Sequence, residues 1–361
     1  MSPDGARDIR LALIGHGWVG RALEQLLEQT APELSERHGV SFRRTLMATR
    51  RAGILVAGGG ISPAAWQRHL EAAQPSPTVD DAVPERLVRL LADPAAPYDV
   101  LVELTTASPN DGQPAAGYLA AALASGRDAV TANKAPVAWH AAALQRAAEA
   151  AGSRLRYEAA VMDCLPVLAI RSAMVPVGAI TGFAGVVNST TNHVLTAMAA
   201  GDDGPGALLD AQRRGIAEAD PAHDLSGHDA ALKATILANL LFDLAAPVTP
   251  AAVGRQGIEP ANPSWDPSWP GRAAAAGRRV KLVARGVCSP EGPPELSVQP
   301  EELPLSDGLA RIDGTSMGLR IDSALGGRLD MVSTTPGVEQ TAYAVLMDLL
   351  ALAGDHRGGR G

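Results

Sequence analysis

Apolar and polar positions in the first part of the chain change repeatedly between strand-like and helix-like spacing. Short apolar runs rich in β-branched residues predict strands at residues 9–14, 40–49, 98–104, 128–131 and 154–160. Apolar residues at helical spacing predict helices at residues 21–29, 114–125 and 137–151. Strands that alternate with helices in this way indicate an α/β fold with a doubly wound parallel sheet.

The pattern changes near residue 164, where the regular alternation ends. Strands are predicted at residues 181–188, 280–287, 296–299 and in alternating segments of 309–322. Helices are predicted from residue 191 onward and at residues 207–214, 228–244 and 340–353. Polar, glycine and proline residues indicate loops at residues 201–206, 217–227 and 260–270. We therefore expect a first domain at residues 1–156, completed by a C-terminal helix at 336–355, and a second α+β domain at 157–335.

Composition and charge limit the classes of partner. The 361 residues are 46% hydrophobic and 19% charged, which supplies enough apolar side chains for two packed domains. The formal net charge is −8 and no basic stripe appears, so we expect no nucleic-acid partner. Cys164 and Cys288 form no C-x-x-C pair, and Asn239 and Asp243 interrupt the longest apolar run. These features predict a cytoplasmic protein with no membrane partner.

A glycine-rich loop follows the first predicted strand and opens the first predicted helix. Its G-x-G-x-x-G spacing is formed by Gly15, Gly17 and Gly20, with Trp18 and Val19 between the last two. The first glycine permits a tight turn, the second lets a pyrophosphate approach the backbone, and the third lets helix and strand pack closely. The loop predicts a Rossmann-type NAD(P)-binding domain. The alternative is a plain turn that only requires small residues.

Residues at two other strand ends bear on the choice of cofactor. Arg50 and Arg51 follow the second strand, at the place where an acid would bind a ribose hydroxyl of NAD. Because guanidinium groups match phosphate geometry, this pair favours NADP, with NAD as the alternative. Thr105 and Thr106 follow another strand, and we expect their hydroxyl groups to line the cofactor. Solvated arginines and a simple turn cap are the structural alternatives.

Asp229 and Lys233 lie four residues apart in the predicted helix at 228–244, so they share one face. Spacing alone favours an exposed ion pair. The preceding loop, however, carries four more ionisable residues, Glu218, Asp220, His223 and Asp224. A lysine in an apolar stretch of helix and one turn from a carboxylate can exchange a proton with a substrate carbonyl. Further carboxylates can bind a substrate ammonium group. The spacing of histidines and acids at 223–229 matches no zinc pattern.

In this order, these residues resemble the homoserine dehydrogenase family over residues 9–353. The matching segments are Gly15 to Gly20, Thr131-Ala132-Asn133-Lys134, Tyr157-Glu158-Ala159, Gly185 to Asn192 and Gly215 to Lys233. The last segment is the most specific, because it follows the family pattern G-x-A-E-A-D-P-x-x-D-x-x-G-x-D-x-x-x-K. The resemblance implies reversible, NADPH-dependent reduction of L-aspartate 4-semialdehyde to L-homoserine, a step in threonine and methionine biosynthesis.

The resemblance also implies roles for single residues. Lys233 is the implied proton donor and acceptor, Asp229 and Lys134 assist at the carbonyl, and Lys134 also lies near the nicotinamide. The implied substrate-binding residues are Glu218, Asp224, Asn188 and Thr190. A sodium ion, held mostly by backbone carbonyls, is implied at Glu158, Val161, Asp163 and Leu165. The second domain is expected to carry a homodimer contact and the catalytic residues.

Three segments depart from the family pattern. Met162-Asp163-Cys164 replaces glycines in the cation loop, residues 334–340 replace a glycine-rich segment, and Ile216 stands where many members have tyrosine. We see no regulatory ACT domain after the last helix, and therefore expect no threonine feedback through one. The departures leave open a relative that acts on another amino-acid semialdehyde. A non-catalytic nucleotide-sensing paralogue is disfavoured, because the implied catalytic residues are all present.

Overall fold

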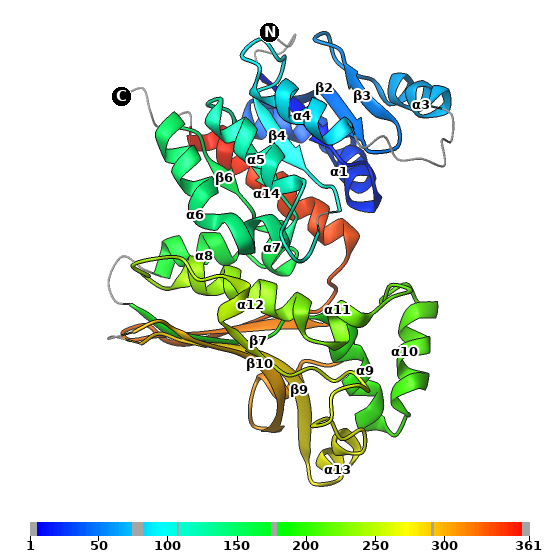
Figure 1. Cartoon of the computed structure of the whole chain (residues 1–361), viewed down its shortest axis with the longest axis vertical. Coiled ribbons are helices and arrows are strands. Elements are labelled where there is room, and N and C mark those ends of the chain that lie inside the picture. The colour runs from blue at the N-terminus through cyan, green and yellow to red at the C-terminus, as the bar shows by residue number, and fades with distance from the viewer. Residues whose placement is uncertain (1–5, 74–81, 107, 175–178, 290–291, 356–361) are drawn as a thin grey trace. The chain divides into compact units, whose positions relative to one another are not determined.

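The chain forms two compact units in the computed structural model. The first comprises Met1–Asp163 and Gly337–Gly361, and the second comprises Cys164–Pro336. The structure describes residues 6–73, 82–106, 108–174, 179–289 and 292–355, which Figure 1 draws as ribbons. Within these ranges, no helix has the length and apolar character needed to cross a membrane.

The first unit is built on a six-stranded sheet in the order β3-β2-β1-β4-β5-β6. Its strands are β1 (Arg7–Ile14), β2 (Val40–Thr49), β3 (Gly53–Val56), β4 (Val100–Glu103), β5 (Asp128–Thr131) and β6 (Leu155–Arg156). All of these pairings are parallel except that of β3, which runs antiparallel to β2. The predicted Rossmann-type doubly wound sheet is confirmed, with β3 as an unpredicted hairpin strand.

Helices cover this sheet in two groups. They are α1 (Trp18–Gln29), α2 (Ala31–Glu33), η1 (Leu34–His38), α3 (Pro63–Ala72), α4 (Val83–Ala92), α5 (Ala115–Ala124), α6 (Lys134–Ala151), α7 (Ala159–Met162) and α14 (Val338–Asp355). Helices α4, α5 and α6 pack side by side in succession, whereas α1 packs against α14 (Figure 1). The predicted strand at 154–160 is wrong beyond residue 156, because the chain turns there and continues as α7.

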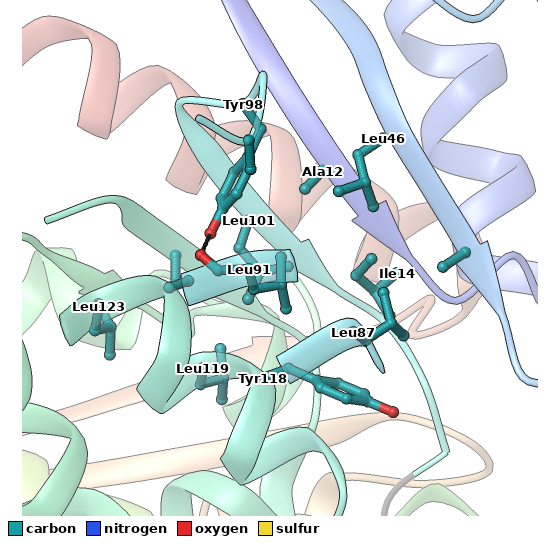
Figure 2. Packing of buried hydrophobic residues seen from close by; sticks show 14 of the residues in the cluster. Ala12, Ile14, Leu46, Leu87, Leu91, Tyr98, Leu101, Tyr118, Leu119 and Leu123 are labelled. Carbon is teal, nitrogen blue, oxygen red and sulfur yellow. Dashed lines mark hydrogen bonds between the residues drawn. The ribbon is translucent and has the colours of Figure 1, made fainter. Parts of the chain in front are cut away.

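One apolar cluster joins the sheet of the first unit to α4 and α5. Figure 2 shows side chains of β1, β2 and β4 facing those of the two helices: Ala12, Ile14, Leu46, Leu101, Leu87, Leu91, Leu119 and Leu123. The hydroxyl of Tyr98 donates a hydrogen bond to the Leu91 carbonyl oxygen at 2.6 Å, so its polar tip is satisfied inside the cluster. Burial of each leucine or isoleucine side chain in this cluster stabilises the fold by roughly 1.5–3 kcal/mol. This core holds the carboxyl ends of the strands at fixed positions.

The second unit contains a six-stranded sheet in the order β12-β11-β7-β9-β10-β8. Its strands are β7 (Ile180–Val186), β8 (Val253–Arg255), β9 (Arg278–Val287), β10 (Glu295–Pro304), β11 (Met317–Ser323) and β12 (Gly327–Ser333). All pairs are antiparallel except β8 with β10. The α+β character expected for this part of the chain is present, and β8 and β12 are strands that the sequence pattern did not predict.

Helices of the second unit pack against its sheet and against one another. They are α8 (Val167–Met174), α9 (Ser189–Ala200), α10 (Gly204–Arg213), α11 (Ala222–Leu225), α12 (His228–Leu241), η2 (Pro250–Ala252), α13 (Trp269–Ala275) and η3 (Leu309–Arg311). Both α9 and α12 pack against β9. Only two residues separate the end of β7 from the start of α9, so this link is held closely over the sheet. The predicted loop at 201–206 is shorter than expected, because Asp203 caps α10.

Candidate active site

The glycine loop between β1 and α1 requires glycine at two positions. Gly15 has φ +96°, and a Cβ atom there would collide with the carbonyl group of Leu104. A Cβ atom on Gly20 would lie 2.7 Å from the carbonyl oxygen of Gly15, so close packing of α1 excludes a side chain. Gly17 is the exposed N-cap residue of α1, and nothing lies within 4 Å of a Cβ added there. The open space at this helix N-terminus suits a pyrophosphate.

The other candidate cofactor residues near this loop are mostly exposed. Arg50 and Arg51 lie in the turn between β2 and β3, and within the described ranges neither forms an ion pair with a carboxylate. Thr49 fixes this turn by accepting a hydrogen bond from the Ala52 amide at 3.0 Å. Two guanidinium groups therefore remain available at the carboxyl end of β2. Trp18 is 75% exposed and Val19 is half-buried, so neither belongs to the core.

A buried carboxylate lies beneath the candidate residues at the ends of β4 and β5. Glu103 accepts hydrogen bonds from the Thr105 amide at 2.7 Å and from the Thr131 hydroxyl at 2.7 Å. Burial raises the pKa of Glu103, while hydrogen bonds from Thr105, Asn133 and Thr131 act against that rise. Thr106 is exposed, and Lys134 is the half-buried first residue of α6. Sequence reasoning missed Glu103, although a lone acid in an apolar strand was a usable signal.

Lys233 is buried in the second turn of α12, where its neighbours along the helix are almost all apolar. Its ammonium group donates a hydrogen bond to the carbonyl oxygen of Val187 at 2.6 Å and lies 3.8 Å from the sulfur of Met317. The Asp229 carboxylate, one helical turn earlier, lies 3.5 Å from the same ammonium group. Because an ammonium group has three donors, Lys233 can hold its position on Val187 and still donate to a substrate oxygen.

Asn188 connects the two carboxylates beside this lysine. Its side-chain oxygen accepts a hydrogen bond from the Thr191 amide at 2.9 Å, which caps α9. Its side-chain nitrogen donates to Asp224 at 2.7 Å and to Asp229 at 3.0 Å. The structure therefore brings Asn188, Asp224, Asp229 and Lys233 into one cluster. Two carboxylates that converge on one amide form an acidic edge that can bind an ammonium group.

The remaining candidate substrate residues lie outside this hydrogen-bonded cluster. Thr190 is buried in the first turn of α9, and its hydroxyl donates to the Ile216 carbonyl oxygen at 3.3 Å. Glu218 is exposed, and within the described ranges its hydrogen bonding is limited to its backbone carbonyl oxygen, which accepts a bond from the side chain of Gln212 at 3.2 Å. Thr190 thus ties α9 to the segment that leads to Glu218, while the Glu218 side chain is not drawn into the cluster.

The candidate sodium-binding residues lie around α7. The Glu158 amide donates to the Asp348 carboxylate at 2.8 Å, and Val161 is buried within α7. Asp163 has φ 51°, and its carboxylate accepts a hydrogen bond from the Thr341 hydroxyl at 3.2 Å. Leu165 belongs to the second unit. No group of three or more His, Cys, Asp or Glu side chains within the described ranges is arranged to hold a metal ion.

Comparison with known families matches nearly the whole chain. Residues 15–158 match the model of the homoserine dehydrogenase NAD-binding domain, and residues 166–350 match the model of homoserine dehydrogenase. The NAD(+)-dependent homoserine dehydrogenase of Pseudomonas canavaninivorans is 34% identical over 95% of this chain and 96% of its own length. The homoserine dehydrogenase of Mycobacterium tuberculosis is 32% identical over 97% of this chain and 74% of its own length.

Solved structures show the same fold. The homoserine dehydrogenase of Thiobacillus denitrificans is similar with a TM-score of 0.80 and 28% identity, over 98% of this chain and 75% of its own. That of Thermoplasma acidophilum is similar with a TM-score of 0.77 and 26% identity, over 96% of this chain and 100% of its own. These similarities cover both units of the molecule.

Proposed function

This chain belongs to the homoserine dehydrogenase family and is an NAD(P)-dependent oxidoreductase, and we propose that it interconverts L-homoserine and L-aspartate 4-semialdehyde with NADP(H) as its preferred cofactor. The observation that carries the proposal is the cluster of Asn188, Asp224, Asp229 and Lys233 in the second unit. It combines a buried amine with an acidic edge, which are the two features that an amino-acid semialdehyde requires. The first unit is the proposed cofactor-binding domain and the second the proposed catalytic domain.

The acidic edge binds and orients the substrate. A carboxylate that hydrogen-bonds a substrate ammonium group makes a strong, charge-assisted contact, and Asp224 is the proposed partner, with Glu218 as a second carboxylate. Asn188 holds Asp224 and Asp229 together, so the two carboxylates stay on the same side of the cluster. Thr190, in the same turn of α9, supports the segment that precedes Glu218.

Lys233 moves the proton of the reaction. In reduction, its ammonium form donates a proton to the aldehyde oxygen, which becomes the hydroxyl oxygen of the product. In oxidation, its neutral amine takes the hydroxyl proton as the carbonyl forms. The nicotinamide, when bound, supplies the hydride to the carbonyl carbon in reduction and accepts it from the same carbon in oxidation. Asp229 orients the lysine from one helical turn away, and Lys134 of the first unit is the proposed assisting and cofactor-binding residue.

The preference for NADP rests on Arg50 and Arg51. Both are exposed at the carboxyl end of β2, where the ribose of a dinucleotide binds in folds of this type. The 2′-phosphate of NADP would form charge-assisted hydrogen bonds with either guanidinium group, whereas the neutral 2′-hydroxyl of NAD would form weaker ones. Gly15, Gly17, Gly20, Thr105 and Thr106 are the proposed residues around the rest of the cofactor, because they lie at the same edge of the sheet.

Substrate chain length tests this proposal. The purified protein is supplied with NADP⁺ or NAD⁺ and with L-homoserine, or with amino alcohols one methylene shorter or longer. We expect kcat/KM for L-homoserine to exceed the others by about tenfold or more, since one methylene typically changes discrimination by that amount. A clear preference for the longer amino alcohol would overturn the proposal and identify another semialdehyde as the substrate.

We further propose a homodimer formed through the sheet of the second unit. Strand β12 is an edge strand with exposed apolar side chains at Leu329 and Val332, and unpaired edges with such residues favour association. Sedimentation should give a dimer that Val332→Asp converts to a monomer. The matched control, Leu209→Asp on the exposed face of α10, should remain a dimer. A wild-type monomer at micromolar concentration would contradict this assembly.

A structural monovalent cation near α7 is also proposed. Asp163 is the non-glycine residue with positive φ in the described part of the chain, and this strained conformation would be stabilised by an ion on nearby backbone oxygens of Glu158 and Val161. The melting temperature should be higher in sodium chloride than in choline chloride at equal ionic strength. Equal melting temperatures would exclude a stabilising sodium ion.

A further inference from the structure

Glu103 is a fully buried acid at the cofactor edge of the first sheet. It ends β4, and its exposed fraction is 0%. Both carboxylate oxygens of Glu103 accept hydrogen bonds. This arrangement suits an ionised carboxylate, which has no proton to donate. Among the residues that the structure describes, Glu103 forms no ion pair with a lysine, arginine or histidine. A buried acid without a counter-ion is costly, so its presence at this edge calls for a role beyond packing.

The carboxylate of Glu103 connects two loops that follow neighbouring strands. From the loop after β4, Thr105 donates with its amide at 2.7 Å and with its hydroxyl at 2.5 Å. From the last residue of β5, the Thr131 hydroxyl donates at 2.7 Å, and from the loop after β5 the side-chain nitrogen of Asn133 donates at 2.9 Å. Asn133 also donates to the carbonyl oxygen of Thr105, so the two loops are joined directly as well.

One of these loops contacts the glycine loop, and the other leads into α6 at Lys134. The glycine loop packs on the first of them, because a Cβ atom on Gly15 would lie 2.7 Å from the Thr105 amide nitrogen. The second loop ends at Asn133, the N-cap residue of α6, and Lys134 is the next residue. Glu103 therefore forms hydrogen bonds both to Thr105, on which the glycine loop packs, and to Asn133, which directly precedes Lys134.

We propose that Glu103 is a positioning residue that holds the glycine loop, Thr105 and Lys134 in one arrangement for the nicotinamide cofactor. The proposal rests on the proposed function for the identity of the cofactor. Glu103 itself does not touch the cofactor. It acts through its hydrogen bonds, and loss of its second acceptor oxygen should loosen at least one of the two loops while the apolar core stays intact.

The substitution Glu103→Gln tests this role. The glutamine amide keeps one acceptor oxygen but replaces the other with an NH₂ group, which cannot accept a hydrogen bond. At least one loop therefore loses a hydrogen bond to residue 103. We expect at least a tenfold increase in the NADPH dissociation constant, measured by nicotinamide fluorescence without substrate, and a lower kcat. The matched control is Asp99→Asn, since Asp99 accepts bonds from Arg10 at the opposite end of β4. It should lower the melting temperature and leave NADPH affinity within twofold of wild type.

A second pair of variants decides the question if Glu103→Gln does not fold. Thr131→Val removes one donor to Glu103, while Thr131→Ser keeps the hydroxyl group. The valine variant should bind NADPH at least threefold more weakly, and the serine variant should match wild type. Folded Glu103→Gln or Thr131→Val with wild-type affinity and kcat would overturn the proposal. Because the assay measures cofactor binding, a wild-type protein that binds NADPH but does not oxidise L-homoserine would defeat only the proposed function.

Discussion

The side-chain nitrogen of Asn188 lies 3.0 Å from the carboxylate of Asp229 and donates a hydrogen bond to it. The same nitrogen donates to Asp224, and the amide oxygen caps α9 through Thr191. A neutral amide thus separates two carboxylates that would otherwise repel each other. Asp229 also lies 3.5 Å from the ammonium group of Lys233. Asn188 therefore holds in place the carboxylate that lies beside the proposed proton donor.

Substitutions at Asn188 should separate its electrostatic role from its capping role. Asn188→Asp keeps an oxygen acceptor for the Thr191 amide but faces Asp224 and Asp229 with a third carboxylate. We expect kcat/KM for L-homoserine to fall at least tenfold with the helix cap retained, so that any loss of stability comes from repulsion among the three carboxylates. Asn188→Ala should lose both activity and the cap, which is worth about 1 kcal/mol.

A second helix cap in the same unit provides the control for Asn188. Asp203 caps α10 by accepting a hydrogen bond from the Gly206 amide at 2.6 Å. Asp203→Ala should therefore destabilise the unit to a similar extent and leave kinetic constants unchanged. If Asn188→Asp retained wild-type kcat/KM, the acidic edge would not be part of the substrate site.

The two arginines after β2 should determine the choice between the two dinucleotides. Arg50→Ala and Arg51→Ala each remove a guanidinium group, and a charge-assisted hydrogen bond to phosphate contributes about 1.5–3 kcal/mol. The double variant should raise KM for NADP⁺ at least tenfold and change KM for NAD⁺ little. Arg146→Ala, at an exposed position on α6, is the control. Equal changes for both cofactors would show that the arginines do not read the 2′-phosphate.

Asp348 should make the first unit less stable as pH rises from about 4 to about 6. Burial raises the pKa of Asp348 to about 6, against the opposing effects of Arg156 and the Glu158 amide. An acid with a raised folded-state pKa binds more protons in the folded state, so its ionisation costs stability between the unfolded and folded pKa values. The shift corresponds to a loss on the order of 2–3 kcal/mol across this window.

Melting temperatures measured between pH 4 and pH 7 test this dependence. Asp348→Asn removes the titrating group and should flatten the decline, although it weakens the bond to Arg156. Glu149→Gln, at an exposed position on α6, should leave the profile unchanged. An identical profile for wild type and Asp348→Asn would assign the pH dependence to other groups.

Local sequence signals were informative where backbone geometry alone imposes a residue type. The glycine loop was predictable because Gly15 and Gly20 leave no room for a side chain, and β2 was predicted at its observed bounds. The face shared by Asp229 and Lys233 followed from helical spacing, and their proximity is as expected. The contact of Gly20 with Gly15 and the contact of Asp229 with Lys233 join residues that are close in sequence.

Features that depend on long-range contacts were not predictable in the same way. Glu103 receives hydrogen bonds from residues as far along the chain as Asn133, and no local pattern reports them. The strand predicted at 154–160 ends early, where the Glu158 amide bonds to Asp348 on the distant helix α14. The family resemblance implies that Glu218 binds substrate together with Asp224, but the Glu218 side chain is exposed and does not join the hydrogen-bonded cluster.

The oxidation of L-homoserine by wild-type protein and by Lys233→Ala, measured side by side, tests the central claim most directly. The absorbance of the reduced nicotinamide is followed with NADP⁺ in excess, and NADPH binding to both proteins is measured by fluorescence. The wild-type protein should turn over, and Lys233→Ala should lose at least about 100-fold in kcat, the typical minimum for loss of a general acid–base group, with cofactor binding unchanged. A folded wild-type protein without turnover, or a Lys233→Ala variant with near-normal kcat, would contradict the account.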